Sequence, residues 1–184
     1  MDEIVKAALK KWPNVPHCRG WLALDARGDW YMRDDRVQRA GPFPQVKGSR
    51  ILHDKLREFI HRNYAADEHG AWFFQNGPQR VYVELEAAPF TWRLSPGSPG
   101  EGSPAITSHS GLAARFESAW LDEQGRLFLA TDLGLGLVHT LDMEAAAEAV
   151  EHGAWAPQEI VFAALPQRFG YRLSPAADAA VQLP

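Results

Sequence analysis

Three side chains suited to metal-binding or acid–base chemistry share one predicted helix face. Asp54, Glu58 and His61 follow one another at intervals of four and three residues, so they project from the same side of a helix. Carboxylate oxygens and an imidazole nitrogen can together hold a divalent cation. A Glu-x-x-His helix is one half of a di-iron site, which needs a matching motif from another helix. Asp54, Glu58 and His61 are therefore the candidate ligand-binding residues.

The same face is also typical of an ordinary solvated helix. Lys55, Arg57 and Arg62 surround the three candidates and balance their charge. A second predicted helix carries only a loose counterpart at a different spacing: Glu144, Glu148 and His152. We therefore favour a solvated face over a ligand site, and expect no metal site and no cofactor.

No other pattern in the sequence matches a catalytic or nucleotide-binding motif. Gly134-Leu135-Gly136 lacks the third glycine and the following helix of a dinucleotide fingerprint. Ser108-His109-Ser110 follows a Pro/Gly-rich stretch, which is a poor platform for a nucleophile and its base. Cys18 lies beside His17, but neighbours in sequence need not place imidazole against sulfur, so a structural cysteine is favoured. The sequence names no catalytic residue and favours a protein that is not an enzyme.

Composition and charge argue against several classes of partner. The formal net charge is -4 and the 19 Lys and Arg residues are scattered rather than gathered into a stripe, which argues against nucleic acid. No apolar run approaches the length of a membrane span, and the acidic start Met1–Ile4 does not resemble a signal peptide. The single cysteine, Cys18, fits a reducing compartment. We expect a bacterial cytoplasmic protein with no nucleic-acid or membrane partner. Its small ligand or protein partner and its oligomeric state stay unknown.

Apolar periodicity and turn residues predict the elements that position these side chains. The helix that carries Asp54, Glu58 and His61 is predicted from residue 49 to about residue 66, with an apolar stripe on its other side. Alternating apolar residues predict a half-buried strand over residues 81–86. The other predicted elements are helices at 2–11 and 142–151, hairpins at 21–32 and 116–130, and a strand at 72–74.

Three short matches, in the same order along the chain, predict an internal repeat. They pair residues 24–28 with 121–125, residues 68–72 with 151–155, and residues 90–96 with 169–175. The second match is the pentapeptide Glu-His-Gly-Ala-Trp, so Trp72 and Trp155 should be equivalent core residues. The predicted fold class is α+β: two degenerate repeats of hairpin, helix and strands, with mainly antiparallel sheets and one helix packed on each.

The repeat also predicts how the chain is divided. Residues 95–104 read Ser-Pro-Gly-Ser-Pro-Gly-Glu-Gly-Ser-Pro, which contains no apolar side chain to stabilise an ordered conformation. The predicted segments are an N-terminal helix and lead-in at 1–20, a first repeat at 21–96, a flexible linker or long loop at 97–115, a second repeat at 116–175, and a C-terminal tail at 176–184.

A further pattern in the first half of the chain combines four segments: Cys18-Arg19-Gly20, Gly28-Asp29-Trp30-Tyr31, the helix after Gly48, and the segment Val81–Phe90. In these segments the chain resembles a bacterial family of unknown function, number twelve-eighty-five among such families. A related uncharacterised family fits the same residues. The resemblance implies an α+β fold with repeated structural motifs and a role in signal transduction. The resemblance assigns no site residues, because no catalytic residues are established for that family.

Three functional hypotheses follow from these patterns. The leading one is a non-catalytic regulatory module that binds a small ligand or a protein partner, in a cleft between the repeats or on an exposed sheet face. One alternative is a metal-assisted enzyme that uses the face formed by Asp54, Glu58 and His61. The other is an assembly or scaffolding protein, in which exposed sheet edges pair with another chain.

Overall fold

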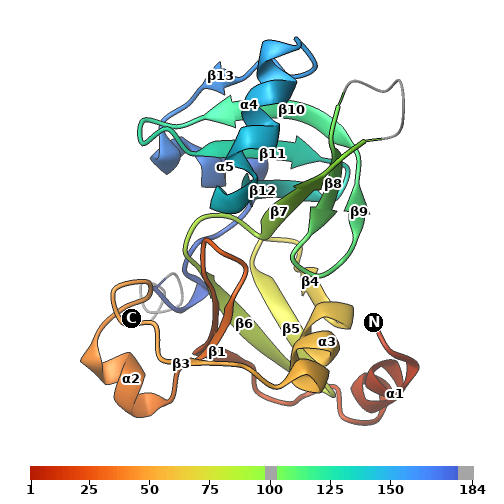
Figure 1. Cartoon of the computed structure of the whole chain (residues 1–184). Coiled ribbons are helices and arrows are strands. Elements are labelled where there is room, and N and C mark those ends of the chain that lie inside the picture. The colour runs from red at the N-terminus through yellow and green to blue at the C-terminus, as the bar shows by residue number, and fades with distance from the viewer. Residues whose placement is uncertain (98–102, 178–184) are drawn as a thin grey trace. The chain divides into compact units, whose positions relative to one another are not determined.

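The computed structural model describes residues 1–97 and 103–177, which form two compact units (Figure 1). Unit 1 comprises residues 1–25, 29–86 and the C-terminal segment from Gly170. Unit 2 comprises residues 26–28 and 87–169. Each unit has its own sheet and helices, so each is described by itself.

The described residues of unit 1 build a six-stranded sheet whose order is β3-β2-β1-β6-β5-β4. Its strands are β1 (Cys18–Leu24), β2 (Trp30–Met32), β3 (Ser49–Arg50), β4 (Tyr64–Ala66), β5 (Trp72–Asn76) and β6 (Gln79–Leu85). Neighbouring strands are antiparallel except for the central pair β1 and β6, which is parallel. The sheet is therefore mixed, with an antiparallel meander on each side of its centre.

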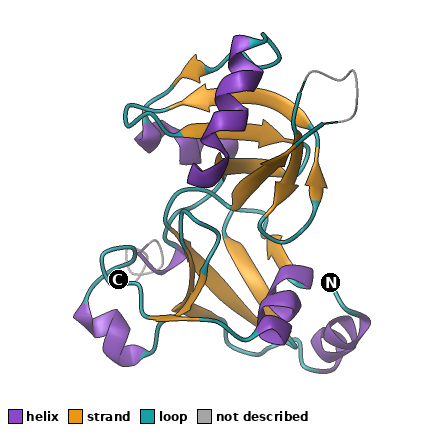
Figure 2. Cartoon of the chain, in the orientation of Figure 1, coloured by secondary structure: helices purple, strands orange, loops and turns teal. Residues whose placement is uncertain are grey.

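Helix α3 (Asp54–Arg62) covers one face of this sheet (Figure 2). Its Ile60 is buried, and the ring of Phe59 packs edge-on against Phe74 of β5 with 5.4 Å between centroids. Apolar residues at alternate positions of the central strands, such as Leu24 and Val83, complete this core. Unit 1 also contains helices α1 (Glu3–Lys11) and α2 (Asp35–Ala40).

The predicted helix at 49–66 is too long at both ends. Ser49–Arg50 pairs with β2 as strand β3, and Tyr64–Ala66 pairs with β5 as strand β4. His53 caps the true N-terminus, because its side chain accepts a hydrogen bond from the backbone N–H of Leu56. Pairing with neighbouring strands satisfies the backbone groups of the flanking residues, a long-range effect that helical periodicity does not contain.

The described residues of unit 2 build a seven-stranded sheet whose order is β13-β10-β11-β12-β7-β8-β9. Its strands are β7 (Phe90–Ser95), β8 (Ala105–Ser108), β9 (Ala113–Ala114), β10 (Phe116–Leu121), β11 (Leu127–Thr131), β12 (Gly134–Val138) and β13 (Gln158–Glu159). A short 3₁₀ turn, η1 (Thr140–Asp142), leads into helix α4 (Met143–Glu151), and the turn η2 (Phe162–Ala164) leads into helix α5 (Leu165–Phe169). The central pair β7 and β12 is again parallel.

The two sheets repeat one topology. In each, a three-stranded meander runs outward from the centre to one edge, and a second three-stranded meander runs inward to the centre, where its last strand pairs in parallel with the first strand of the unit. Unit 2 adds one strand, β13, outside β10. Strands β1 to β6 thus correspond in order to β7 to β12. These sheets and helices confirm the predicted α+β class.

Four hairpin turns among the described residues share one five-residue geometry. They span Asp25–Asp29, Asp67–Ala71, Ser108–Leu112 and Asp122–Arg126. In each, the first residue's N–H donates to the carbonyl oxygen of the fifth at 2.8 to 3.1 Å, and its side-chain oxygen accepts from the fifth residue's N–H at 2.8 to 3.0 Å. The fourth residue is always a glycine with positive φ, a conformation that disfavours side chains.

The segments that correspond by strand order differ from the segments that the three sequence matches had predicted to correspond. The β4–β5 turn of Asp67–Ala71 corresponds to the β10–β11 turn of Asp122–Arg126. The pentapeptide that begins at Glu68 therefore lies in a hairpin, whereas the one that begins at Glu151 ends helix α4. Likewise residues 90–96 contain strand β7, whereas residues 169–175 are largely irregular.

The predicted equivalence of Trp72 and Trp155 is wrong. Trp72 lies half-buried at the start of β5, with its ring 4.6 Å from that of Tyr64. Trp155 is buried outside any strand and stacks on Phe116 at 5.3 Å. Both are packing residues, but Trp72 belongs to a strand and Trp155 does not, so their positions in the two units are unrelated.

The compact units also divide the chain differently from the predicted segments. Strand β7 belongs to unit 2, and the predicted linker at 97–115 contains β8 and β9, while its residues 98–102 lie outside the described part. The segment after Gly170 joins unit 1, where the Leu85 N–H donates to the Leu173 carbonyl at 2.8 Å and Glu84 accepts a hydrogen bond from Ser174. Of the predicted tail at 176–184, residues 178–184 lie outside the described part.

Substitution by alanine should destabilise the protein to different extents at two glycines that occupy the same turn position. Gly125 and Gly70 have φ of 74° and 77°, so each substitution costs about 1 kcal/mol in backbone strain. A Cβ on Gly125 meets nothing within 4 Å, whereas one on Gly70 would lie 2.0 Å from the Gly170 carbonyl oxygen. We expect Gly70→Ala to lower the free energy of unfolding by about 3 kcal/mol, measured by urea denaturation. Equal losses for the two variants would contradict the packing of the C-terminal segment on this turn.

Candidate functional site

Helix α3 places the three predicted ligand residues in three different environments. Asp54 is exposed and forms an ion pair with Arg57. Glu58 is exposed. His61 is half-buried, and its Nε2 accepts a hydrogen bond from the indole Nε1 of Trp30 at 2.9 Å. The shared helix face therefore does not give these side chains one shared environment.

The surroundings of His61 keep its imidazole ring uncharged. Burial lowers the pKa of His61 from 6.5 to about 4, and the nearby positive charge of Arg57 adds to this shift. The ring is thus neutral at physiological pH, with Nε2 as acceptor. Within residues 1–97 and 103–177, no group of three or more His, Cys, Asp or Glu side chains is arranged to hold a metal ion. Ligand binding by Asp54, Glu58 and His61 stays a prediction, and these contacts favour a structural role for His61.

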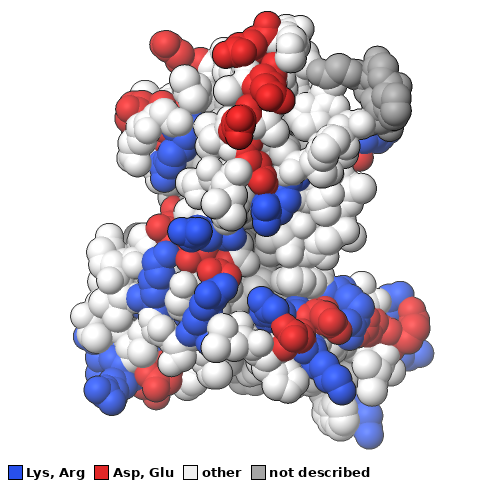
Figure 3. All heavy atoms as spheres, viewed as in Figure 1, with Lys and Arg blue, Asp and Glu red and all other residues white. Residues whose placement is uncertain are grey.

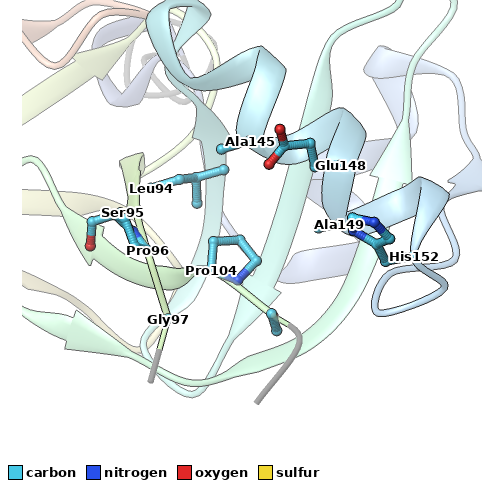
Figure 4. Close-up of a pocket in the computed structure, with 10 residues that line it drawn as sticks. Leu94, Ser95, Pro96, Gly97, Pro104, Ala145, Glu148, Ala149 and His152 are labelled. Atoms are coloured by element: carbon cyan, nitrogen blue, oxygen red, sulfur yellow. The ribbon is translucent and has the colours of Figure 1, made fainter. Parts of the chain in front are cut away.

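A ligand-sized pocket lies in unit 2, between helix α4 and the end of strand β7 (Figure 4). Its volume is about 360 Å³. It is lined by Leu94, Ser95, Pro96 and Gly97, by Ser103 and Pro104, and by Ala145, Glu148, Ala149 and His152 of the helix region. Most of the wall is apolar, and its ionisable side chains are Glu148 and His152.

The pocket follows from the parallel pairing of β7 with β12. Parallel strands end at the same edge of a sheet, so the chain that leaves β12 enters η1 and α4 beside the end of β7. The backbone N–H of His139 donates to the carbonyl oxygen of Trp92 at 2.9 Å. Gly136 permits this close pairing, because a Cβ there would lie 2.4 Å from the Trp92 indole nitrogen.

An ion pair and a hydrogen bond hold the two ends of the pocket wall in place. Asp142, just before α4, accepts hydrogen bonds from Arg93 Nε at 2.6 Å and from the Leu94 N–H at 3.0 Å. The hydrogen bond and charge of Arg93 lower the pKa of Asp142. At the other end, the Trp155 indole nitrogen donates to Ser103 Oγ at 3.1 Å. These contacts hold the strand and the helix on opposite sides of the pocket.

Helix α4 presents its pocket residues at one helical spacing. Residues 145, 148, 149 and 152 follow the i, i+3, i+4, i+7 pattern of a single face. The small side chains Ala145 and Ala149 leave room beside β7, and Glu148 and His152 project on the same side of the helix (Figure 4). In the sequence, Glu148 and His152 stand out as a loose counterpart of the α3 face, and the spacing of Ala145 and Ala149 is the further signal that marks this face.

The surface around the pocket is acidic. Unit 2 contains ten Asp and Glu but five Lys and Arg, whereas unit 1 contains thirteen and fourteen. Acidic side chains follow the exposed face of α4 (Figure 3), and those of the helix are Glu144, Glu148 and Glu151. The electrostatic potential at the pocket therefore favours cations.

A smaller groove lies on the α3 face of unit 1. Its volume is about 250 Å³ and its lining, which includes Trp21, Met32 and Leu56, is almost entirely apolar. It is smaller than typical ligand pockets, and its polar side-chain groups are the amides of Asn76 and Gln79, the thiol of Cys18 and the indole N–H of Trp21. The α4 pocket matches the usual composition of a ligand site better.

The fold and pocket define an α+β protein of two related mixed sheets. A family model described as "Protein of unknown function (DUF2946)", under the heading DUF2944, matches residues 1–176. The chain belongs to this family. No curated protein matches the chain.

Two solved structures of DUF1285 family proteins are similar to the chain. The protein from Silicibacter pomeroyi has a TM-score of 0.50 and 14% identity, over 79% of this chain and 83% of that one. The protein from Shewanella baltica has a TM-score of 0.49 and 13% identity, over 70% of this chain and 91% of that one. At these identities the likeness concerns the fold alone, and it confirms the predicted resemblance. No helix in the described residues is long and apolar enough to span a membrane.

The depressed pKa of His61 predicts a pH-dependent stability. The unfolded chain binds a proton near pH 6.5 and the folded protein only near pH 4, so the stabilisation is complete above pH 6.5 and is lost as the pH falls toward 4. After allowance for solvent screening of the half-buried ring, the loss is about 2 kcal/mol. Urea unfolding between pH 7 and pH 4.5 measures it.

A matched pair of variants isolates this histidine. His61→Gln keeps an acceptor for Trp30 but does not titrate, so it should flatten the pH dependence. The control His69→Gln alters an exposed histidine and should leave the dependence unchanged. Identical pH profiles for wild type and His61→Gln would show that His61 is not held neutral by burial.

Proposed function

We propose that the protein is a non-catalytic binding module whose α4 pocket receives a small ligand. The observation that carries this proposal is the pocket of about 360 Å³, whose size and mixture of apolar wall with few polar groups are typical of ligand sites. It lies at the carboxyl end of β7, the strand that pairs in parallel with β12. Ligands often bind at such strand ends in open α/β sheets, and the comparison with this sheet is an analogy.

The pocket chemistry supports binding rather than catalysis. The hydroxyl of Ser103 accepts a hydrogen bond from Trp155, whereas a catalytic serine donates to a general base. Glu148 and His152 are both exposed, so neither occupies the desolvated environment that tunes a catalytic acid or base. Ligand recognition needs only shape, apolar contact and a fixed charge, all of which the wall supplies.

The resemblance to the DUF1285 proteins supports a bacterial origin, and the single cysteine supports a reducing compartment. We infer a bacterial cytoplasmic protein that acts as a regulatory module, in which the bound ligand alters contact with a signalling partner. Fractionation of cells that express the protein tests the location, and recovery from the periplasm or the membrane would contradict it.

Filling the pocket should abolish binding without unfolding the protein. Ala145 lines the pocket, whereas Ala147 is exposed on the same helix and does not. Ala145→Leu should therefore remove ligand-induced shifts of backbone NMR signals at Leu94 and Ala149, and Ala147→Leu should retain them. A library of small amines, carboxylic acids and alcohols provides the probes.

Two outcomes would contradict the proposed function. One is the absence of any probe that shifts the signals of the pocket residues at millimolar concentration. The other is a set of shifts that survives Ala145→Leu, because such probes bind elsewhere. Circular dichroism of both variants checks that the helix is intact.

A further inference from the structure

We propose that the ligand of the α4 pocket is an aliphatic amine, bound as its ammonium cation with Glu148 as the counter-charge. This inference rests on the proposed function and specifies its ligand class. It joins three features of the pocket: a carboxylate that forms no ion pair with any described residue, an acidic surrounding surface and an aliphatic wall.

Glu148 differs from the paired aspartates of the same unit. Three aspartates of unit 2 form ion pairs with arginine: Asp122 with Arg126, Asp132 with Arg115 and Asp142 with Arg93. Among the described residues, no Lys, Arg or His nitrogen lies within 4.0 Å of the carboxylate of Glu148. This carboxylate is therefore available to a cation supplied by a ligand.

Figure 4 shows the geometry that a cationic ligand would meet. The side chain of Glu148 leaves α4 between Ala145 and His152, with its carboxylate on the side of Leu94. A ligand in the pocket thus has one fixed negative charge beside it. An ammonium group placed there gains a charge-assisted hydrogen bond.

The surrounding charge strengthens the preference for a cation. The exposed face of α4 also carries Glu144 and Glu151, and unit 2 as a whole has ten acidic and five basic residues. This field attracts cations and repels carboxylates and phosphates. An anionic ligand is therefore disfavoured.

The wall opposite Glu148 specifies the rest of the ligand. Leu94, Pro96 and Pro104 face the helix from the strand side, and Ala145 and Ala149 form the helix side between the polar residues. These saturated side chains suit an aliphatic body. A bare metal ion is a poor occupant, because it requires several oxygen or nitrogen ligands and the wall supplies one carboxylate and one imidazole.

Three probes of equal chain length separate charge from apolar contact: n-pentylammonium, 1-pentanol and pentanoate. Their binding is followed by NMR titration of the wild-type protein, with dissociation constants on the order of millimolar expected for such small probes. Pentylammonium should bind roughly threefold to fivefold more tightly than pentanol, as an exposed ion pair provides. Pentanoate should bind most weakly. Raising the salt concentration from 50 to 500 mM should reduce the advantage of pentylammonium.

Glu148→Gln and Glu151→Gln form the matched pair of variants. Both glutamates are exposed on α4, but Glu148 lines the pocket and Glu151 does not. Glu148→Gln should remove the preference for pentylammonium over pentanol, and Glu151→Gln should retain most of it. Because glutamine has a similar helix propensity to glutamate, both variants should keep the fold.

The outcomes separate the two proposals. Equal binding of pentylammonium and pentanol at the pocket would overturn the amine inference and leave the proposed function standing. Tighter binding of pentanoate, or a pentylammonium preference that survives Glu148→Gln, would also overturn it. If none of the three probes shifts the pocket signals and the wider library also fails, the proposed function itself fails.

Discussion

The parallel pair of strands at the centre of each sheet is the constraint on which the rest of the structure depends. Strands β1 and β6, and likewise β7 and β12, join two antiparallel meanders that would otherwise be separate. A three-stranded meander buries little apolar surface alone, whereas the joined sheet has a continuous core. In unit 2 the same pairing sets where the chain emerges. Because β12 runs in the same direction as β7, the chain that leaves it enters α4 beside the end of β7, and the pocket forms between them.

The general fold was predictable because its signals are local. Alternating apolar residues in β6, the turn residues of the hairpins and the apolar stripe of α3 each report their own element, so the α+β class followed from the sequence. The ends of α3 did not, because Ser49–Arg50 and Tyr64–Ala66 are held by pairing with β2 and β5. Pairing between distant strands leaves little trace in the periodicity of either one.

The sequence matches indicated a repeat, but most of the segments that they matched do not correspond in the two sheets. The reason lies in the turn residues. Four turns share the pattern of an oxygen-bearing first residue and a fourth-position glycine, because this hairpin geometry demands it. Short matches that contain such turns recur throughout the chain and cannot reveal which strands correspond. The Glu-His-Gly-Ala-Trp match even joined a hairpin to a helix end, since a positive-φ glycine, Gly70 or Gly153, serves both. The order of strands, in contrast, identifies the two copies without reference to sequence.

Local sequence patterns also miss the long-range contacts that define the candidate sites. Helical spacing correctly placed Asp54, Glu58 and His61 on one helix, but the partner that defines His61 is Trp30, thirty-one positions away. In unit 1 the helix α3 connects the two meanders and packs on the sheet. In unit 2 the corresponding connection from β9 to β10 is only residue Arg115, and the helix follows β12 instead. The α4 pocket therefore depends on a helix that the shared topology does not duplicate, so the ligand binding that we propose would be a property of unit 2 and not of the fold.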